Sequence, residues 1–105
     1  MSKLLEIFAK HIDMSIDLGN TLKVILIDTA EIKELDRKEH NSNIFCIDNE
    51  SNIIWQIDSK SGLIEKDSFV YIKKVNDGII AHRFFGTEYL INPSTGVTQK
   101  VGWHK

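Results

Sequence analysis

The sequence predicts a mainly β, single-domain protein: an antiparallel β-meander that forms a small barrel or a two-layer sheet, with room for a short N-terminal helix before it. In several short runs, apolar residues alternate with polar ones or follow one another closely, as in half-buried or buried strands. Turn-forming residues separate these runs at regular spacing. The 105 residues suit one domain with one core over 1–105.

The N-terminal segment favours a helix followed by a hairpin. Residues 3–11 place apolar side chains at i+3 and i+4 spacings, which predicts a short amphipathic helix with Ser2 as its cap; a first strand is the alternative. Residues 12–18 then alternate with period two, and 21–28 form a more continuous apolar run. Gly19-Asn20 between them predicts the turn of a hairpin.

A charged connection follows at residues 29–42, where few side chains are apolar. We expect this segment to be solvated, with one helical turn capped by Thr29.

The segment "NIFCIDNESNIIWQID" (43–58) predicts the next hairpin, with two apolar runs around a polar turn. Asn52 is the residue expected to adopt the left-handed conformation in that turn. In the predicted register Cys46 faces Trp55, Ile44 faces Ile57, and Ile47 meets Ile54 on the other side. Both faces are then apolar, which predicts central strands covered on two sides.

A further hairpin is predicted from 68–75 and 79–85, with a three-residue turn through Asn76-Asp77-Gly78. This turn pairs Phe69 with Phe85, Tyr71 with Arg83 and Val70 with Phe84. A two-residue Asp77-Gly78 turn would shift every pair by one.

The last hairpin is predicted over 87–103, where Pro93 sets φ for the turn and Gly96 supplies a left-handed residue. Its "LINPSTGVTQK" aligns at the turn with "CIDNESNIIWQ" of the earlier hairpin. The two segments, 44–57 and 88–101, resemble hairpins of quinoprotein-like β-propeller repeats. A propeller needs at least four four-stranded blades, so we interpret the resemblance as shared turn chemistry and infer no cofactor or site from it.

Composition and charge narrow the classes of function. The net charge of −2 argues against a dedicated duplex-DNA binder. Residues 1–67 hold 8 Lys/Arg and 13 Asp/Glu, so the acidic part of the chain suits a basic partner. The only cysteine is Cys46, which excludes an intrachain disulfide, and no run reaches the roughly 20 apolar residues of a membrane span. We expect a cytoplasmic protein without membrane contact.

Motifs for metal, cofactor or catalysis are weak. Asp48, Glu50 and Asn52 match positions 1, 3 and 5 of a calcium loop, but Ile53 and Ser59 replace its diagnostic Gly and Glu. The four histidines do not have metal-ligand spacing. A core position is expected for Cys46, where a thiol behaves as a small hydrophobe. We therefore predict no metal, no cofactor and no catalytic residues, and the sequence favours a non-enzymatic role.

The surface candidate is the hairpin over 68–85, which interleaves aromatic and cationic side chains. Such a face could bind a partner, or stack the bases and hold the phosphates of single-stranded nucleic acid. The alternative is that the cations only cover an apolar sheet with their stems. The predicted partner-binding residues are Tyr71, Lys73, Lys74, His82 and Arg83.

The leading functional hypothesis is a small non-catalytic binding module that acts through protein–protein interaction, similar in profile to immunity or inhibitor proteins. An acidic surface and strand edges available for pairing motivate it. The alternative is a small-molecule-binding or enzymatic β-barrel, with Trp55, Tyr71 and Trp103 lining a cavity. Nucleic acid is the less favoured partner, and a homodimer through a strand edge suits either hypothesis.

Overall fold

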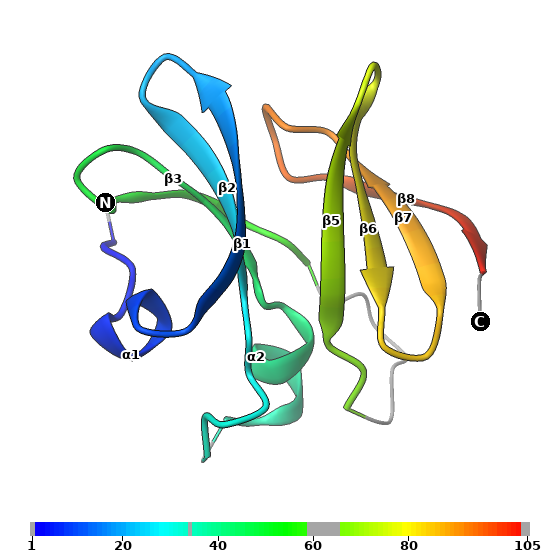
Figure 1. Cartoon of the computed structure of the whole chain (residues 1–105), viewed down its shortest axis with the longest axis horizontal. Helices are drawn as coiled ribbons and strands as arrows, with labels where there is room; N and C mark the ends of the chain where they lie inside the picture. Colours follow the sequence, from blue (N-terminus) through cyan, green and yellow to red (C-terminus); the bar gives the residue numbers. More distant parts are fainter. Residues whose placement is uncertain (1, 34, 59–65, 104–105) are drawn as a thin grey trace.

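The computed structural model describes residues 2–33, 35–58 and 66–103 and contains two four-stranded antiparallel sheets (Figure 1). Each sheet is a meander in which strands adjacent in sequence are neighbours in space. Both sheets are open within these residues, so the mainly β fold in two layers is confirmed and the closed barrel is not. The first sheet contains β1 (Ile12–Gly19), β2 (Leu22–Ile27), β3 (Ile44–Ile47) and β4 (Ile53–Gln56); the second contains β5 (Phe69–Val75), β6 (Gly78–Arg83), β7 (Thr87–Ile91) and β8 (Thr98–Trp103).

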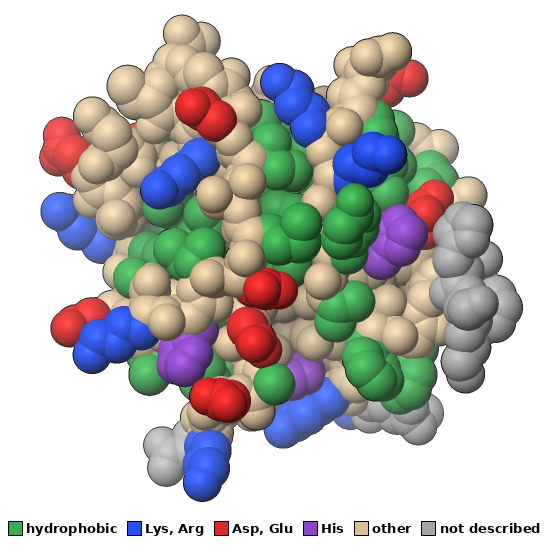
Figure 2. Space-filling model, in the orientation of Figure 1, with side chains coloured by type: hydrophobic (Ala, Val, Ile, Leu, Met, Phe, Trp, Pro, Cys, Tyr) green, Lys and Arg blue, Asp and Glu red, His purple; other side chains and the backbone are tan. Residues whose placement is uncertain are grey.

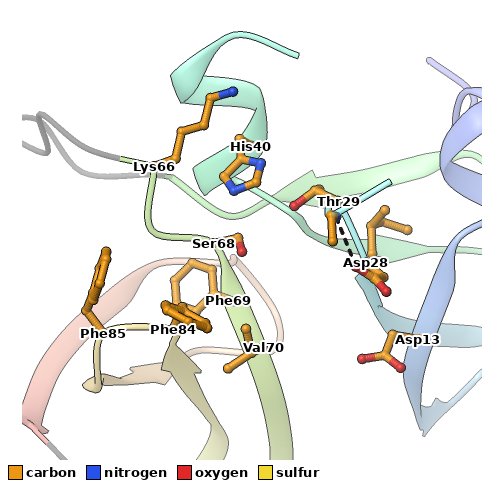
Figure 3. Close-up of a pocket in the computed structure, with 12 residues that line it drawn as sticks. Asp13, Asp28, Thr29, His40, Lys66, Ser68, Phe69, Val70, Phe84 and Phe85 are labelled. Carbon is orange, nitrogen blue, oxygen red and sulfur yellow. Dashed lines mark hydrogen bonds between the residues drawn. The ribbon is translucent and has the colours of Figure 1, made fainter. Parts of the chain in front are cut away.

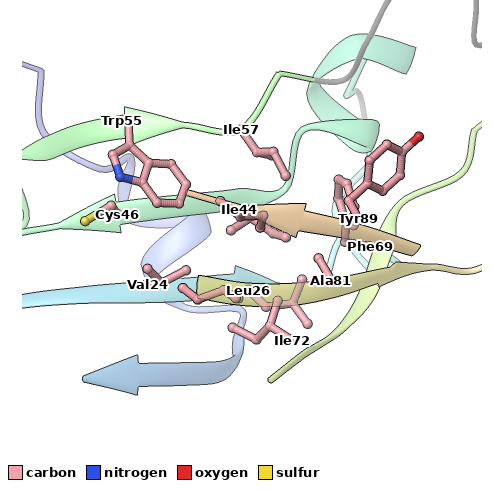
Figure 4. Close-up of a cluster of buried hydrophobic side chains, with 12 residues drawn as sticks. Val24, Leu26, Ile44, Cys46, Trp55, Ile57, Phe69, Ile72, Ala81 and Tyr89 are labelled. Carbon is pink, nitrogen blue, oxygen red and sulfur yellow. The ribbon is translucent and has the colours of Figure 1, made fainter. Parts of the chain in front are cut away.

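The main core lies between the two sheets (Figure 4). Side chains alternate along a strand, so β2 sends Val24 and Leu26 into this core and turns Ile25 and Ile27 the other way. The same core is lined from the second sheet by β5, β6 and β7. The members labelled in Figure 4 are Val24, Leu26, Ile44, Cys46, Trp55, Ile57, Phe69, Ile72, Ala81 and Tyr89.

A second core covers the opposite face of the first sheet. There Ile25, Ile27 and Phe45 pack against α1 (Glu6–Ala9) and the preceding Leu4. Strands β2 and β3 are therefore buried on both faces, which explains their continuous apolar runs and confirms the prediction for β3. Strand β4 is instead an edge strand, and its Ile54 is 40% exposed.

The N-terminal helix is shorter than predicted. It covers only four residues, and its N-terminus has no side-chain cap, so the predicted cap by Ser2 is wrong. Residues 2–4 are extended instead: Leu4 N donates to Ser51 O at 2.8 Å, and Ile53 N donates to Ser2 O at 2.7 Å. The chain start thus satisfies backbone groups at the edge of β4 that a longer helix would leave unpaired.

The connection before β3 differs from the prediction in two ways. Its helix, α2 (Arg37–Asn41), is capped by Asp36 and not by Thr29, and Asp36 and Glu39 form a reciprocal capping box. The end of the segment is not solvated, because Asn41, Ser42 and Asn43 are all buried.

In the part of the chain that the structure describes, no helix is long and apolar enough to span a bilayer.

The β3–β4 turn is organised by Asp48. Its carboxylate accepts hydrogen bonds from Glu50 N at 2.9 Å, Asn52 N at 2.9 Å and the Asn52 side chain at 3.0 Å. These bonds, the side-chain bond foremost, lower the pKa of Asp48. The residue in the left-handed conformation is Ser51, with φ 64°, so the prediction for Asn52 is wrong. Asn52 instead donates its backbone and side-chain N–H groups to the Asp48 carboxylate.

The register of that hairpin is confirmed in part. Cys46 pairs with Trp55 as predicted, and Ile57 N donates to Ile44 O at 3.0 Å. Ile47 pairs with Ile53, however, because a bulge beyond Cys46 displaces Ile54 from the ladder.

The predicted register of the β5–β6 hairpin is wrong by one residue. The turn uses Asn76-Asp77, so Val75 pairs with Gly78 and Tyr71 pairs with His82. A bulge at Val70 then aligns Phe69 with Arg83. A shift of one residue moves each side chain to the other face, which is why Arg83 is in the interior and His82 is outside.

The β7–β8 hairpin is confirmed, and its turn joins the two sheets. Gly96 has φ 78°, and Gly96 N donates to Asn92 O at 2.8 Å. The ring of Trp55 in the first sheet packs on Gly96, and Trp55 Nε1 donates to Pro93 O at 2.9 Å. A side chain of one sheet is therefore anchored to the turn of the other.

Candidate binding cleft

The structure separates the five predicted partner-binding residues. Residues paired across antiparallel strands share a face, so Tyr71, Lys73 and His82 lie on the outer face of the second sheet. Lys74 pairs with the buried Ile79, which places it at the end of the inner face, where its side chain is still exposed. Whether these four residues bind a partner remains a prediction.

The outer face of the second sheet holds one polar cluster. His82 Nε2 lies 2.8 Å from Glu88 Oε2, and the Tyr71 ring meets the His82 ring edge-on at 5.5 Å. The carboxylate of Glu88 at this position repels a nucleic-acid phosphate.

Arg83 has a structural position. Its side chain is 2% exposed, contrary to the expected surface location. The guanidinium donates to Asp67 O at 2.6 Å, to Asn41 O at 3.2 Å and to the Tyr89 hydroxyl at 3.3 Å. It also lies 4.1 Å from the centre of the Phe69 ring. Arg83 thus ties together three segments that are far apart in sequence.

A cleft of about 490 Å³ opens where the first strands of the two sheets meet (Figure 3). Strand β5 packs against β1 and β2 at this junction. Figure 3 shows side chains from β1 and the loop after β2 on one side, and from β5 and the end of β6 on the other. Its lining includes the apolar Val70, Phe84 and Phe85 and the ionisable Asp13, Asp28, His40 and Lys66.

One wall of the cleft is apolar and open to solvent. Phe84 is 69% exposed, Val70 45% and Phe85 42%, and the two phenylalanine rings meet edge-on at 5.3 Å. Figure 2 shows hydrophobic side chains gathered along the junction of the sheets and beside β5. A group of exposed apolar side chains that lie next to one another is typical of interaction sites.

The other wall carries negative charge. Asp13 and Asp28 are both exposed, and Asp28 Oδ1 accepts a hydrogen bond from Ala30 N at 3.0 Å. In Figure 3 the carboxylate of Asp13 points across the cleft towards Val70. Asp13 and Val70 each occupy a β-bulge. The strand pairing shifts between Ile12 and Met14 in β1, and again between Phe69 and Tyr71 in β5. Bulges redirect side chains, which here brings an acid and an aliphatic group to the same opening.

The third side of the cleft is formed by α2 and the residues just before β5. His40 and Lys66 lie there (Figure 3). Burial lowers the pKa of His40, and the charge of Lys66 lowers it further. His40 is therefore neutral at pH 7, and Lys66 supplies the positive charge at this end.

A buried amide network holds the walls in place. Asn43 Nδ2 donates to Ile27 O at 2.7 Å and to Phe69 O at 2.8 Å, and its Oδ1 accepts from Phe69 N at 2.9 Å. Asp67 N donates to Asn41 Oδ1 at 2.6 Å, and Asp67 Oδ1 accepts from Phe85 N at 2.9 Å. The cleft is thus supported by hydrogen bonds that fix backbone from both sheets, as a preformed site requires.

Possible metal ligands and the thiol of Cys46 are the other chemistry-bearing groups that the sequence singled out. No group of three or more His, Cys, Asp or Glu gathers to hold a metal ion among the residues described. Cys46 is buried as predicted, and burial raises its pKa, which keeps the thiol protonated and unreactive. Trp55 is in the core and Tyr71 on an outer face, so they do not line one cavity; the side chain of Trp103 lies outside the described residues.

Sequence reasoning missed this cleft. The adjacent Phe84 and Phe85 were assigned to strand positions, whereas β6 ends at Arg83 and both rings follow it. Two consecutive aromatic residues before Gly86 were the available signal, since neighbouring residues of a strand cannot both face one core. Asp13 and Val70 gave no signal, because bulges depend on pairing.

Comparison with known proteins gives one finding about the family. A family model described as a domain of unknown function, DUF7957, matches residues 3–103. The matched range includes both hairpins that resemble β-propeller repeats, and the matching family is not a β-propeller family. Neither the curated proteins nor the solved structures yield a match. Because the family model matches nearly the whole sequence, the chain belongs to the DUF7957 family.

Proposed function

We propose that this protein is a non-catalytic module that binds another protein through the apolar cleft at the junction of its two sheets. The observation that carries the proposal is the exposure of Phe84, at 69%, beside Val70 and Phe85. Leaving three large apolar side chains in water costs free energy that burial under a partner recovers, at about 25 cal/mol per Å². The backbone N–H groups of Phe84 and Phe85 are already held by hydrogen bonds to Ser68 O and Asp67 Oδ1, which limits the entropy lost on binding.

A small-molecule site is the second candidate. The cleft volume of about 490 Å³ falls within the range of ligand pockets, and the lining is mainly apolar with a few polar groups. Two features favour a protein instead. The space between the sheets is filled by the main core, and a small ligand in the cleft would leave most of Phe84 in water.

Single-stranded nucleic acid is less well supported. Among the side chains that the structure describes on the outer face, only Tyr71 and Lys73 combine an exposed aromatic with a cation, because Arg83 is buried and His82 contacts Glu88. A backbone-tracking groove needs more cations than this face provides.

The test is a quantitative affinity purification from lysate of the native host, comparing the tagged wild type with two double variants. Phe84→Ser/Phe85→Ser alters the cleft wall. Val97→Ser/Val101→Ser is the matched control, because those valines are 65% and 45% exposed on another part of the molecule.

We expect a protein that the wild type and the control enrich equally and that the cleft variant enriches at least about tenfold less, as for an aromatic anchor. A partner retained fully by the cleft variant would contradict the proposed site. If only a low-molecular-weight compound co-purified, the second candidate would replace the first.

A further inference from the structure

We propose that the segment bound in the cleft is a stretch of protein with an apolar anchor side chain followed or preceded closely by a lysine or arginine. This inference rests on the proposed function and adds the chemistry of the partner. It depends on three features of the cleft: the apolar wall, the two carboxylates that face it, and the cation at the remaining side.

The anchor follows from the apolar wall. Val70 and Phe84 border the opening, and Phe84 and Phe85 form an edge-to-face pair that offers ring surface to a further apolar group. An aromatic or long aliphatic side chain fits such a wall best, since anchors of this type contribute most of the energy of small interfaces.

The cation follows from the acidic wall. Asp13 is directed across the cleft, and Asp28 lies on the same wall (Figure 3). Binding an apolar segment partly dehydrates both carboxylates, which is unfavourable unless a positive charge comes with it. Figure 2 shows acidic side chains beside the apolar area. A lysine or arginine on the partner compensates the two aspartates and accelerates association.

The orientation follows from Lys66. This residue and the neutral His40 border the end of the cleft formed by α2. A second cation there would be repelled, so the basic residue of the partner is restricted to the side of β1. The cleft therefore fixes on which side of the anchor the basic residue lies, whichever end of the bound segment carries it.

The probe for the test is a phage-displayed library of random dodecamer peptides, panned in parallel on three proteins. These are the wild type, the variant Asp13→Asn/Asp28→Asn, and the variant Phe84→Ser/Phe85→Ser. The asparagine side chains keep the shape and the oxygen that accepts from Ala30 N, so they remove charge without disturbing the loop. Urea unfolding of each variant checks that the fold is retained.

The wild type is expected to enrich peptides with an aromatic, Leu, Ile or Met residue close to a Lys or Arg. The asparagine variant keeps the apolar preference and loses the basic one, and the serine variant loses both. A synthetic consensus peptide is then expected to bind the wild type about fivefold more tightly than its Lys→Glu version, and this ratio falls on the asparagine variant or at high salt.

Two results overturn the inference, and they are distinguishable. Enriched peptides that need Phe84 and Phe85 but show no basic preference, or an acidic one, would refute the partner chemistry and leave the proposed function intact. If no peptide is enriched, or if enrichment survives in the serine variant, the cleft is not the binding site and both proposals fail.

Discussion

Replacing Asn43 with alanine tests how much one buried amide contributes to the contact between the two sheets. Asn43 is 2% exposed, and its side chain makes three hydrogen bonds, to Ile27 O in the first sheet and to both backbone groups of Phe69 in the second. Alanine removes all three partners and leaves the backbone groups in a dry interior. At about 1 kcal/mol for each bond, the free energy of unfolding is expected to fall by about 3 kcal/mol.

The assay is equilibrium urea unfolding of the wild type, Asn43→Ala and Asn49→Ala, with the slope against urea compared as well as the midpoint. Asn49 is the control because it lies exposed in the β3–β4 turn, and its replacement should change stability by less than about 0.5 kcal/mol. A total of 5–15 kcal/mol is usual for a domain of this size, so the loss is measurable. If Asn43→Ala lost less than about 1 kcal/mol at an unchanged slope, the hydrogen bonds of this amide would not contribute appreciably to joining the sheets.

Two further predictions follow from local geometry and from a shifted pKa. Gly96→Ala should destabilise the fold by at least about 2 kcal/mol, because the new Cβ would lie 2.6 Å from atoms of the Trp55 ring and φ is +78°; an unchanged urea midpoint would contradict this. The folded pKa of His40 is lowered, so between that value and the ordinary pKa near 6.5 the unfolded chain binds more protons, and stability falls as pH drops below about 6.5. The fall in urea midpoint between pH 7.5 and 5.0 should be smaller in His40→Gln, and equal falls in the two proteins would show that His40 is not responsible.

Local patterns account for most of the strands and turns. Alternation over 12–18 and the hairpin through Pro93 and Gly96 were predictable, because each depends on the period of a strand or on the φ that a turn residue allows. The hairpin between β1 and β2 was predicted as well, but its turn is wrong by one residue: Gly19 pairs with Leu22, and the two turn residues with positive φ are Asn20 and Thr21. The continuous apolar run at 44–47 likewise indicated a strand buried on both faces.

Local patterns could not predict which face of its sheet the side chain of Arg83, Val70 or Asp13 occupies. A hairpin can close with turns that differ by one residue, and a bulge adds a residue to one strand without any strong local preference. Burial of apolar side chains selects the register of this hairpin, because the observed register places Phe69, Ile72, Ala81 and Tyr89 in one core.

The sequence by itself determined that this chain is a β-meander with an acidic N-terminal part, because periodicity, turn chemistry and charge are properties of neighbouring residues. Only the tertiary structure decided that the eight strands divide into two open sheets and that Arg83 is inside. It alone also placed Phe84 opposite the carboxylates of Asp13 and Asp28 in one cleft. The physical reason is that a binding cleft depends on which distant segments share a core, and the packing free energy of the whole chain sets that arrangement.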